Sequence, residues 1–505
     1  MTELHASIYQ IEDSKDFKYP KDLWEHLATN LQKQYPDKYA FRSNTGFSVV
    51  ALNESAISPC KTLTRYRRIA VSIRRKRDHS TLIEISAQNI FQRQGEPLFA
   101  RVDLKEYPKL QKWIREAQQV SLNDNIRMIT GFISDVTACG FKVSEAPLIS
   151  FSYPAPKVET IRGELSFPVE KPSNLFKQVY SPPRYLNFTI STLFEKEQSI
   201  DGSVIQNINN TLRSLLGPTN CHQLQHSLGA MKDSLNIIVI PEDLELHENL
   251  RSREILRACE SKGYLFKLTK LSSLNNRFSL KTLLCDLLHI GGACFWKPAD
   301  TSIGFFAVDA GHSKTQNKSR WTKVETDSQL NIVSLKTFDT PLAEHIPDHL
   351  VNELWPTQET AVFCRDGRFS KEQRAYRERG FKENRPMLEV KKYPRSILWR
   401  SENQINKGSI FGDAIVDPHG EITIQSCTQN INDYISPLRI NIVHGEQNTI
   451  INEFLNQLCL QSLSTFSISR LHGALYYADL MSKLTEVGWP KVIGRGFRLE
   501  ETIPL

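Results

Sequence analysis

Short apolar runs alternate with helically periodic segments in the second half of the chain. The apolar runs 234–241 and 264–270 are each followed by a segment whose apolar residues recur at helical spacing, 253–263 and 279–292. Strand, helix, strand, helix in this order predicts a parallel α/β sheet. Strands are also expected at 303–309, near 329–338 and at 360–367, and helices near 341–355, at 370–380 and near 447–464.

The first 150 residues have a different pattern. Three short β-rich runs between 47 and 87 lie among amphipathic segments at 22–31 and 107–117, which is typical of an α+β domain. From about 147 to 185 the chain is weakly periodic and contains several prolines, a composition found in linkers. We therefore expect an α+β domain over 1–150, a linker over 151–200, and two α/β domains over 201–297 and 298–505.

Composition narrows the class of protein. The chain of 505 residues is 40% hydrophobic and 24% charged, as in ordinary globular proteins. No stretch approaches the roughly 18 uncharged apolar residues of a membrane span, and the N-terminus lacks a secretory pattern, so we expect a cytoplasmic protein without membrane contact. The nine cysteines form no C-x-x-C pair, which favours reduced thiols. The Cys/His cluster at 221–226 lacks a second ligand pair, so zinc is not expected.

Positive charge is concentrated in one segment. The net charge of +7 permits a polyanionic partner without requiring one. Residues 61–78 hold eight Lys or Arg, and their inner part alternates as a strand does. This segment is either a solvated edge strand, in which Lys and Arg discourage aggregation, or a contact to a nucleic-acid backbone. The pattern favours neither.

Three acids stand out by their placement. Asp309 and Asp366 each end an apolar strand, and Asp479 is expected early in a late helix. Carboxylates from neighbouring strand ends and a helix can converge on Mg²⁺ or Mn²⁺, and a two-metal site hydrolyses phosphodiesters. The alternative is three unrelated surface acids, and by spacing alone the two interpretations are comparable.

The sequences around these acids resemble a known family. Residues from about 230 to 505 resemble the MID and PIWI domains of prokaryotic Argonaute proteins, of the short or PAZ-lacking type. The motifs that carry the resemblance are G-G-A-C-F-W (291–296), F-F-A-V-D-A-G-H (305–312), V-F-C-R-D-G-R (362–368), P-M-L-E-V-K-K-Y-P-R (386–395), the segment 454–480 ending in Y-Y-A-D-L, and the C-terminal E-E-T-I-P-L. The resemblance implies a Rossmann-like MID domain over 201–297 and an RNase H-like PIWI domain over 298–505.

It also implies roles for single residues. Asp309, Asp366 and Asp479 would hold the metals, and Glu344 would be the fourth acid, with Glu325 as the second choice. Arg251, Lys267, Lys270, His289 and the C-terminal Leu505 would contact the 5′ end of a guide strand. His289 stands where the family usually has Lys, and could instead cap its helix. The basic segment 61–78 could line the nucleic-acid channel.

Three functions follow from the resemblance. The first is a guide-directed endonuclease in prokaryotic defence, which binds a short guide strand and cuts the complementary target. The second is a guide-binding subunit that senses a target without cleavage and activates a partner effector encoded in the same operon. The third is an RNase H-like nuclease that uses no guide.

Overall fold

The computed structural model divides the chain into two compact units. Unit 1 comprises residues 1–153, 391–407 and 412–441, and unit 2 comprises 154–390, 408–411 and 442–505. The structure describes residues 4–12, 17, 19–42, 47–56, 63–75, 81–93, 120–153, 157–166, 175–192, 200–218, 220–227, 229–240, 242, 264–299, 303–313, 317–328, 332–343, 346–357, 361–367, 369, 374–392, 396–400, 410–428, 437–464, 471, 473–482, 492–493 and 497–498.

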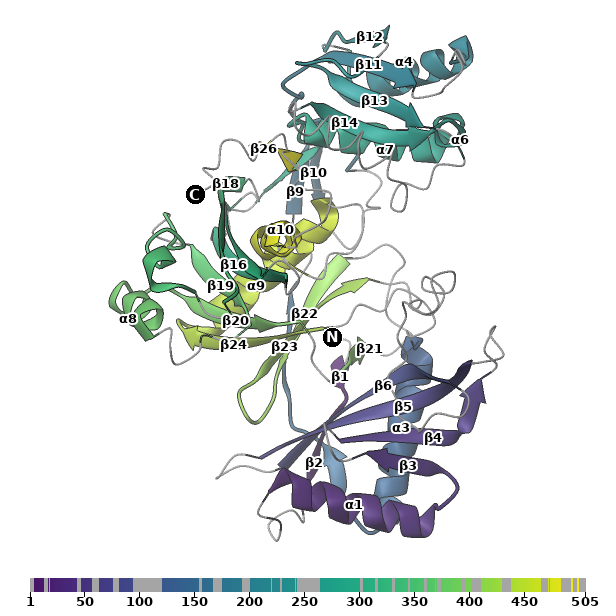
Figure 1. Ribbon diagram of the computed structural model, residues 1–505, viewed down its shortest axis with the longest axis vertical. Helices are drawn as coiled ribbons and strands as arrows, with labels where there is room; N and C mark the ends of the chain where they lie inside the picture. The colour runs from purple at the N-terminus through teal and green to yellow at the C-terminus, as the bar shows by residue number, and fades with distance from the viewer. Residues whose placement is uncertain are drawn as a thin grey trace. The chain divides into compact units, whose positions relative to one another are not determined.

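Unit 1 contains a six-stranded sheet in the order β3-β4-β5-β6-β2-β7 (Figure 1). Its elements are β1 (Leu4–Ala6), β2 (Ile8–Ile11), α1 (Pro20–Gln34), β3 (Tyr39–Arg42), β4 (Phe47–Ala56), β5 (Leu63–Arg74), β6 (Thr81–Arg93), α3 (Leu122–Ala138), β7 (Val143–Glu145), β8 (Ile149–Tyr153), β21 (Leu398–Arg400), β22 (Ile410–Val416), β23 (Ile422–Thr428) and β24 (Leu438–His444), the last of which continues into unit 2. The strands β24, β23, β22 and β8 are neighbours in that order.

Helices α1 and α3 cover one face of the six-stranded sheet. α1 begins with Pro20, a residue suited to the first helical turn, and its side chains Leu23, Trp24, Leu27 and Leu31 are buried at helical spacing. In α3, the Ser121 hydroxyl accepts a hydrogen bond from the Asp124 backbone N–H and caps the helix. The predicted helix at 22–31 is therefore confirmed, whereas the one at 107–117 lies outside the described residues.

The basic segment is not an edge strand. β5 pairs with β4 on one side and with β6 on the other, so the interpretation of 61–78 as a solvated sheet edge is wrong. Two of its charges are paired with acids from other elements: Arg67 with Asp124 of α3 at 3.2 Å, and Arg74 with three carboxylates. Long-range partners of this kind leave no trace in the local sequence pattern.

Unit 2 has two main sheets. Its elements are β9 (Lys157–Thr160), β10 (Gly163–Ser166), β11 (Asn187–Thr192), α4 (Gly202–Leu216), β12 (Gln223–His226), β13 (Leu235–Ile240), β14 (Leu265–Lys270), α6 (Leu271–Asn275), α7 (Arg277–Ile290), β15 (Trp296–Pro298), β16 (Phe305–Ser313), β17 (Lys318–Thr326), β18 (Ile332–Pro341), a 3₁₀ turn (Asp348–Leu350), β19 (Val362–Asp366), α8 (Arg374–Lys382), β20 (Met387–Lys391), α9 (Gln447–Ser464), α10 (Gly473–Ser482), β25 (Val492–Ile493) and β26 (Phe497–Arg498).

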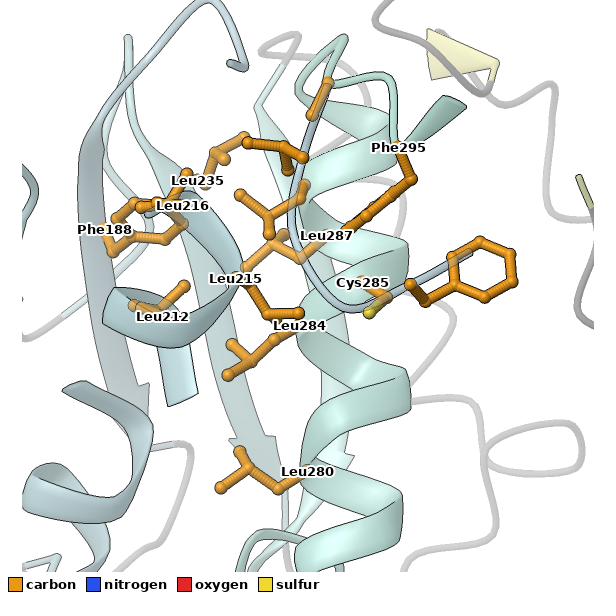
Figure 2. Packing of buried hydrophobic residues seen from close by; sticks show 14 of the residues in the cluster. Phe188, Leu212, Leu215, Leu216, Leu235, Leu280, Leu284, Cys285, Leu287 and Phe295 are labelled. Atoms are coloured by element: carbon orange, nitrogen blue, oxygen red, sulfur yellow. The ribbon is translucent and has the colours of Figure 1, made fainter. Parts of the chain in front are cut away.

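The first sheet of unit 2 is parallel, as predicted. Its strands lie in the order β12-β11-β13-β14, and all three pairings are parallel. Helices α4 and α7 pack their apolar faces together against it, with Leu212, Leu215 and Leu284 among the buried side chains (Figure 2). The stretch expected to be a linker, 151–200, is not one throughout, because β9, β10 and β11 lie in it.

The second sheet contains the strands β18-β17-β16-β19-β20, in that order. The strands β16, β18 and β19 and the helices α8 and α9 confirm elements expected from the sequence. One element was missed and one expectation is wrong. β17 was not predicted, and the helix near 341–355 is replaced, within the described residues, by a single 3₁₀ turn at Asp348–Leu350. The predicted helix at 253–263 lies outside the described part of the chain.

Candidate metal centre

The candidate site lies on one face of β16 and β19, which are parallel neighbours. Phe306 is paired with Phe363 and Val308 with Arg365, so continuing the register by one residue brings Asp309 beside Asp366. Successive side chains of a strand point to opposite faces. Asp309 therefore shares a face with Phe305, and Asp366 shares that same face.

Helices α9 and α10 cover this face. The ring of Phe305 meets that of Phe454 on α9, with 6.1 Å between centroids, whereas the rings of Phe306 and Phe363 contact each other at a tilted angle in the core under the opposite face. α10 packs on β16 and β17 (Figure 1). Asp479 is the seventh of the ten residues of α10, so the expectation that it lies early in its helix is wrong.

The three predicted acids come together. One carboxylate oxygen from each of Asp309, Asp366 and Asp479 lies within 4.8 Å of the other two. Asp309 is 7% exposed, and its Oδ1 also accepts a hydrogen bond of 2.7 Å from the Ala310 N–H. Carboxylates this close repel one another unless a cation lies between them, and an all-oxygen donor set suits Mg²⁺ or Mn²⁺. These residues therefore fit a hard divalent cation.

A turn after β19 presents Asp366. Gly367 has a positive φ of 88°, a conformation that favours glycine, and its N–H donates to the Val390 carbonyl at 2.8 Å. The buried Glu389 carboxylate accepts a 2.7 Å hydrogen bond from the Phe369 N–H and so fixes the far end of this turn. Sequence reasoning missed Glu389, although the acid inside the apolar P-M-L-E-V run was a signal.

The fourth acid is not located by the structure. Glu344 lies outside the described residues. Glu325, the second choice, is 0% exposed and accepts hydrogen bonds from the Thr357 backbone N–H and hydroxyl while pairing with Lys323 at 3.1 Å. It is also three residues along β17 from Thr322, the residue paired with Asp309, and so points to the opposite face of the sheet. Glu325 therefore stabilises the fold rather than the acidic site.

The predicted guide-binding residues divide between two places. Lys267, within β14, pairs with Asp286 of α7 at 3.0 Å, and His289 lies in the last turn of α7. Lys270 is the last residue of β14, three residues after Lys267, and donates to the Glu242 carbonyl at 2.5 Å. Arg251 and Leu505 lie outside the described residues.

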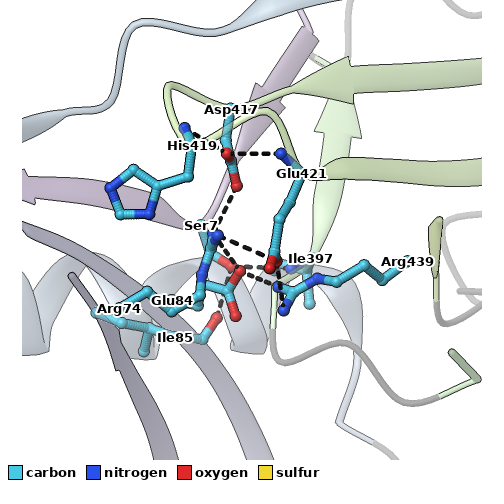
Figure 3. Close-up of polar contacts among 9 residues, drawn as sticks. All are labelled: Ser7, Arg74, Glu84, Ile85, Ile397, Asp417, His419, Glu421 and Arg439. Carbon is cyan, nitrogen blue, oxygen red and sulfur yellow. Dashed lines mark hydrogen bonds and ion pairs between the residues drawn. The ribbon is translucent and has the colours of Figure 1, made fainter. Parts of the chain in front are cut away.

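A second group of acids lies in unit 1 (Figure 3). Glu84, Asp417 and Glu421 also offer oxygens within 4.8 Å of one another. Here two guanidinium groups are already among them: Arg74 pairs with all three acids at 2.6 to 3.0 Å, and Arg439 pairs with Glu84 and Glu421. With two cationic side chains in place, this group forms a buried ion-pair network rather than a metal site.

Comparison with solved structures identifies the fold. No protein-family model matches the chain, and no curated protein matches its sequence. Three-dimensional matches cover nearly all of it: Clostridium butyricum Argonaute bound to a guide DNA and a 19-mer target DNA (TM-score 0.69, 13% identity, 96% of this chain and 88% of that one), Drosophila Piwi (0.64, 10%, 95% and 87%), and Marinitoga piezophila Argonaute in complex with 5′ OH guide RNA and target DNA (0.60, 12%, 95% and 87%).

The chain is therefore an α/β protein with the Argonaute fold, and it has a group of three acids built on buried strands. Its architecture matches the MID and PIWI arrangement, as the resemblance implied. At 10–13% identity the likeness concerns the fold. Among the described helices, none combines the length and the apolar character needed to cross a membrane.

Proposed function

We propose that this protein is a nucleic-acid-guided endonuclease of prokaryotic defence, acting in the cytoplasm. It binds a short guide strand and cuts the complementary target strand. The convergence of Asp309, Asp366 and Asp479 on one side of the second sheet of unit 2 carries the proposal. The similar folds seen with guide and target strands in Clostridium butyricum and Marinitoga piezophila Argonautes support it.

Each acid has a defined part in the proposed chemistry. Asp309, Asp366 and Asp479 would hold divalent cations, which when bound supply an activated water and a stabilised leaving oxygen in phosphodiester hydrolysis. Asp309 and Asp366 are held by adjacent strands buried on both faces, so their spacing is preorganised. Asp479 completes the site through the packing of α10 on β16. Glu344 is proposed as the fourth acid from its place in the sequence.

Sequence choice would come from base pairing, while the protein binds the backbones of the paired strands. The proposed domains are an α+β N-terminal domain over 1–150, a MID-like domain over 201–297 that binds the guide end, and a PIWI-like domain over 298–505. The basic strand β5 does not need to contact nucleic acid for this function, because at least Arg67 and Arg74 are paired with acids.

The test is cleavage by purified protein supplied with guide, labelled complementary target and Mn²⁺ or Mg²⁺. We expect cutting of the target at one position, set by the guide. Asp309→Asn and Asp366→Asn should each reduce cutting by 100-fold or more, on the order of the loss for a catalytic group, with guide binding retained. Asp37→Asn, which removes an exposed acid of unit 1, is the matched control.

The same experiment distinguishes the proposed endonuclease from the two alternative functions. Binding of guide and target without cutting under any metal and guide type would favour the target-sensing subunit that activates a partner effector. Cutting that survives both Asp→Asn changes would refute the site. Cutting without any guide, with no short strands co-purifying from cells, would favour the guide-independent nuclease.

A further inference from the structure

A buried hydroxyl lies beside the acidic site. Thr322 on β17 is paired with Asp309 on β16 in the antiparallel ladder, so the two side chains lie on the same face of the sheet. Thr322 is 0% exposed, and its Oγ1 makes no hydrogen bond to any of the residues that the structure describes. A buried hydroxyl without a partner is uncommon, because it loses its hydrogen bonds to water without replacing them. The fold therefore keeps a group that disfavours it.

Helix α10 covers the position of Thr322. α10 packs on both β16 and β17 and carries Asp479, so Thr322 lies next to Asp309 and under the helix that supplies the third acid. Directly paired residues of neighbouring antiparallel strands have Cβ atoms about 4.5–5.5 Å apart, which is close enough for one water molecule to bridge their oxygens. The hydroxyl is thus on the same side of the sheet as the carboxylates and within reach of a water bound among them.

A second threonine on the same face of β17 shows the usual arrangement. Thr326 lies four residues after Thr322, so its side chain points to the same face. It is also 0% exposed, but its hydroxyl donates a hydrogen bond of 3.3 Å to the Phe305 carbonyl. The hydroxyl that lacks a partner is therefore the one beside the acids. This position points to a partner that arrives with the cation.

We propose that the Thr322 hydroxyl accepts a hydrogen bond from a water in the hydration shell of the divalent cation and positions that water beside Asp309. The inference rests on the proposed metal centre and adds a positioning residue to it. Mg²⁺ keeps several waters when few carboxylates bind it, and a threonine hydroxyl has two lone pairs that accept hydrogen bonds. Groups that hold the outer shell of a metal typically change its affinity by about 10–100-fold. For a single hydroxyl we expect the lower end of this range.

The experiment measures Mn²⁺ affinity, by electron paramagnetic resonance of the free ion, and thermal unfolding of the metal-free protein. The full-length protein is compared with Thr322→Val, Thr322→Ser and the matched control Thr326→Val. Thr322→Val keeps the shape of the side chain and removes the hydroxyl. It should weaken Mn²⁺ binding about tenfold and raise the melting temperature of metal-free protein by about 2 °C, because a buried group without a partner is removed.

The other two variants separate the hydroxyl from the shape of the side chain. Thr322→Ser retains the hydroxyl and should keep the Mn²⁺ affinity of the unchanged protein. Thr326→Val loses a hydroxyl that is hydrogen-bonded within the fold. It should therefore lower the melting temperature by about 2 °C and leave Mn²⁺ affinity unchanged.

Unchanged Mn²⁺ affinity in Thr322→Val would overturn the inference, as would an equal loss of affinity in Thr322→Ser or in Thr326→Val. A lower melting temperature of metal-free Thr322→Val would show that the hydroxyl already has a partner, and would overturn it as well. These results leave the metal centre itself in place. Failure of the unchanged protein to bind Mn²⁺, or binding that Asp309→Asn does not weaken, would refute the proposed metal centre and the inference with it.

Discussion

Arg74 holds the most concentrated set of buried charges in the described part of unit 1. Its guanidinium pairs with Glu84 and Asp417 at 2.6 Å each and with Glu421 at 3.0 Å, and the side chains of Glu84 and Asp417 are 1% exposed (Figure 3). Arg74→Met would leave three carboxylates facing Arg439 alone. Removing one partner from a buried ion pair costs about 3–5 kcal/mol, because the remaining charge is left uncompensated. For Arg74→Met we expect a loss of about 3 kcal/mol of stability, the lower end of this range, because Glu421 is 30% exposed and water can solvate its charge.

Hydrogen exchange of the β5 and β6 amides is the measurement, because it reports the opening free energy of one region in a chain of two units. A loss of about 3 kcal/mol speeds exchange of the most protected amides by roughly 100-fold. The matched variant is Glu84→Gln, which leaves two acids facing two arginines. Burial, with smaller contributions from Glu421 and Asp417, raises the pKa of Glu84 above its ordinary value, although Arg439 and Arg74 act to lower it.

The pH dependence has a definite sign. Since the folded pKa of Glu84 is above its unfolded value of 4.5, its contribution to stability is fully present below pH 4.5 and is lost as the pH rises through the folded pKa. Glu84→Gln should remove this dependence and cost clearly less than Arg74→Met at neutral pH. Equal exchange rates in Arg74→Met and unchanged protein would refute the reasoning, as would slower exchange of the unchanged protein on adding Mg²⁺, which would indicate a metal site.

Three further changes test unit 2 by thermal unfolding. Lys323→Met should lower the free energy of unfolding by about 3–5 kcal/mol, because it leaves the fully buried Glu325 without the Lys323 ammonium. Adding Glu325→Gln should recover much of this loss, and no recovery would show that the pair is not coupled. Asn236→Leu should cost about 3 kcal/mol, because the buried amide bonds the Met231 N–H and the Leu265 carbonyl; a cost under 1 kcal/mol would contradict this. Asp309→Asn should raise the stability of metal-free protein by about 1 kcal/mol and abolish stabilisation by Mn²⁺, and a lower metal-free stability would argue against mutual repulsion.

The elements that the sequence predicted correctly are those with one unambiguous environment. β13 is buried along its whole length and its sequence is apolar apart from Asn236, and α7 keeps an apolar face at helical spacing. Asp309 and Asp366 could be found for the same reason, since each is the acid that interrupts such a run. The parallel pairing of β16 and β19 brings these two acids together, whereas the spacing alone left their convergence with Asp479 open.

The elements that were missed are those whose pattern of hydrophobic and polar residues predicts a different structure. β17 reads K-S-R-W-T-K-V-E-T, which looks exposed, yet Lys323 and Glu325 are buried as a pair. In the segment expected as a helix, Ile346, Leu350 and Leu354 are spaced four apart and all are buried. Their spacing matches a helix, but the described backbone there contains one 3₁₀ turn, and the segment covers the sheet without forming an α-helix. Periodicity alone does not distinguish the two arrangements.

The acidic site shows how a chain retains groups that disfavour its own folding. Three carboxylates within 4.8 Å of one another oppose the folded state when no cation is bound. The strands that present Asp309 and Asp366 are packed on both faces, by Phe306 and Phe363 below and by Phe305 and Phe454 above, so the repulsion is offset by burial that does not depend on the acids. A geometry that is kept against repulsion and built on rigid strands is what a functional site requires, and it sets these three acids apart from incidental surface acids.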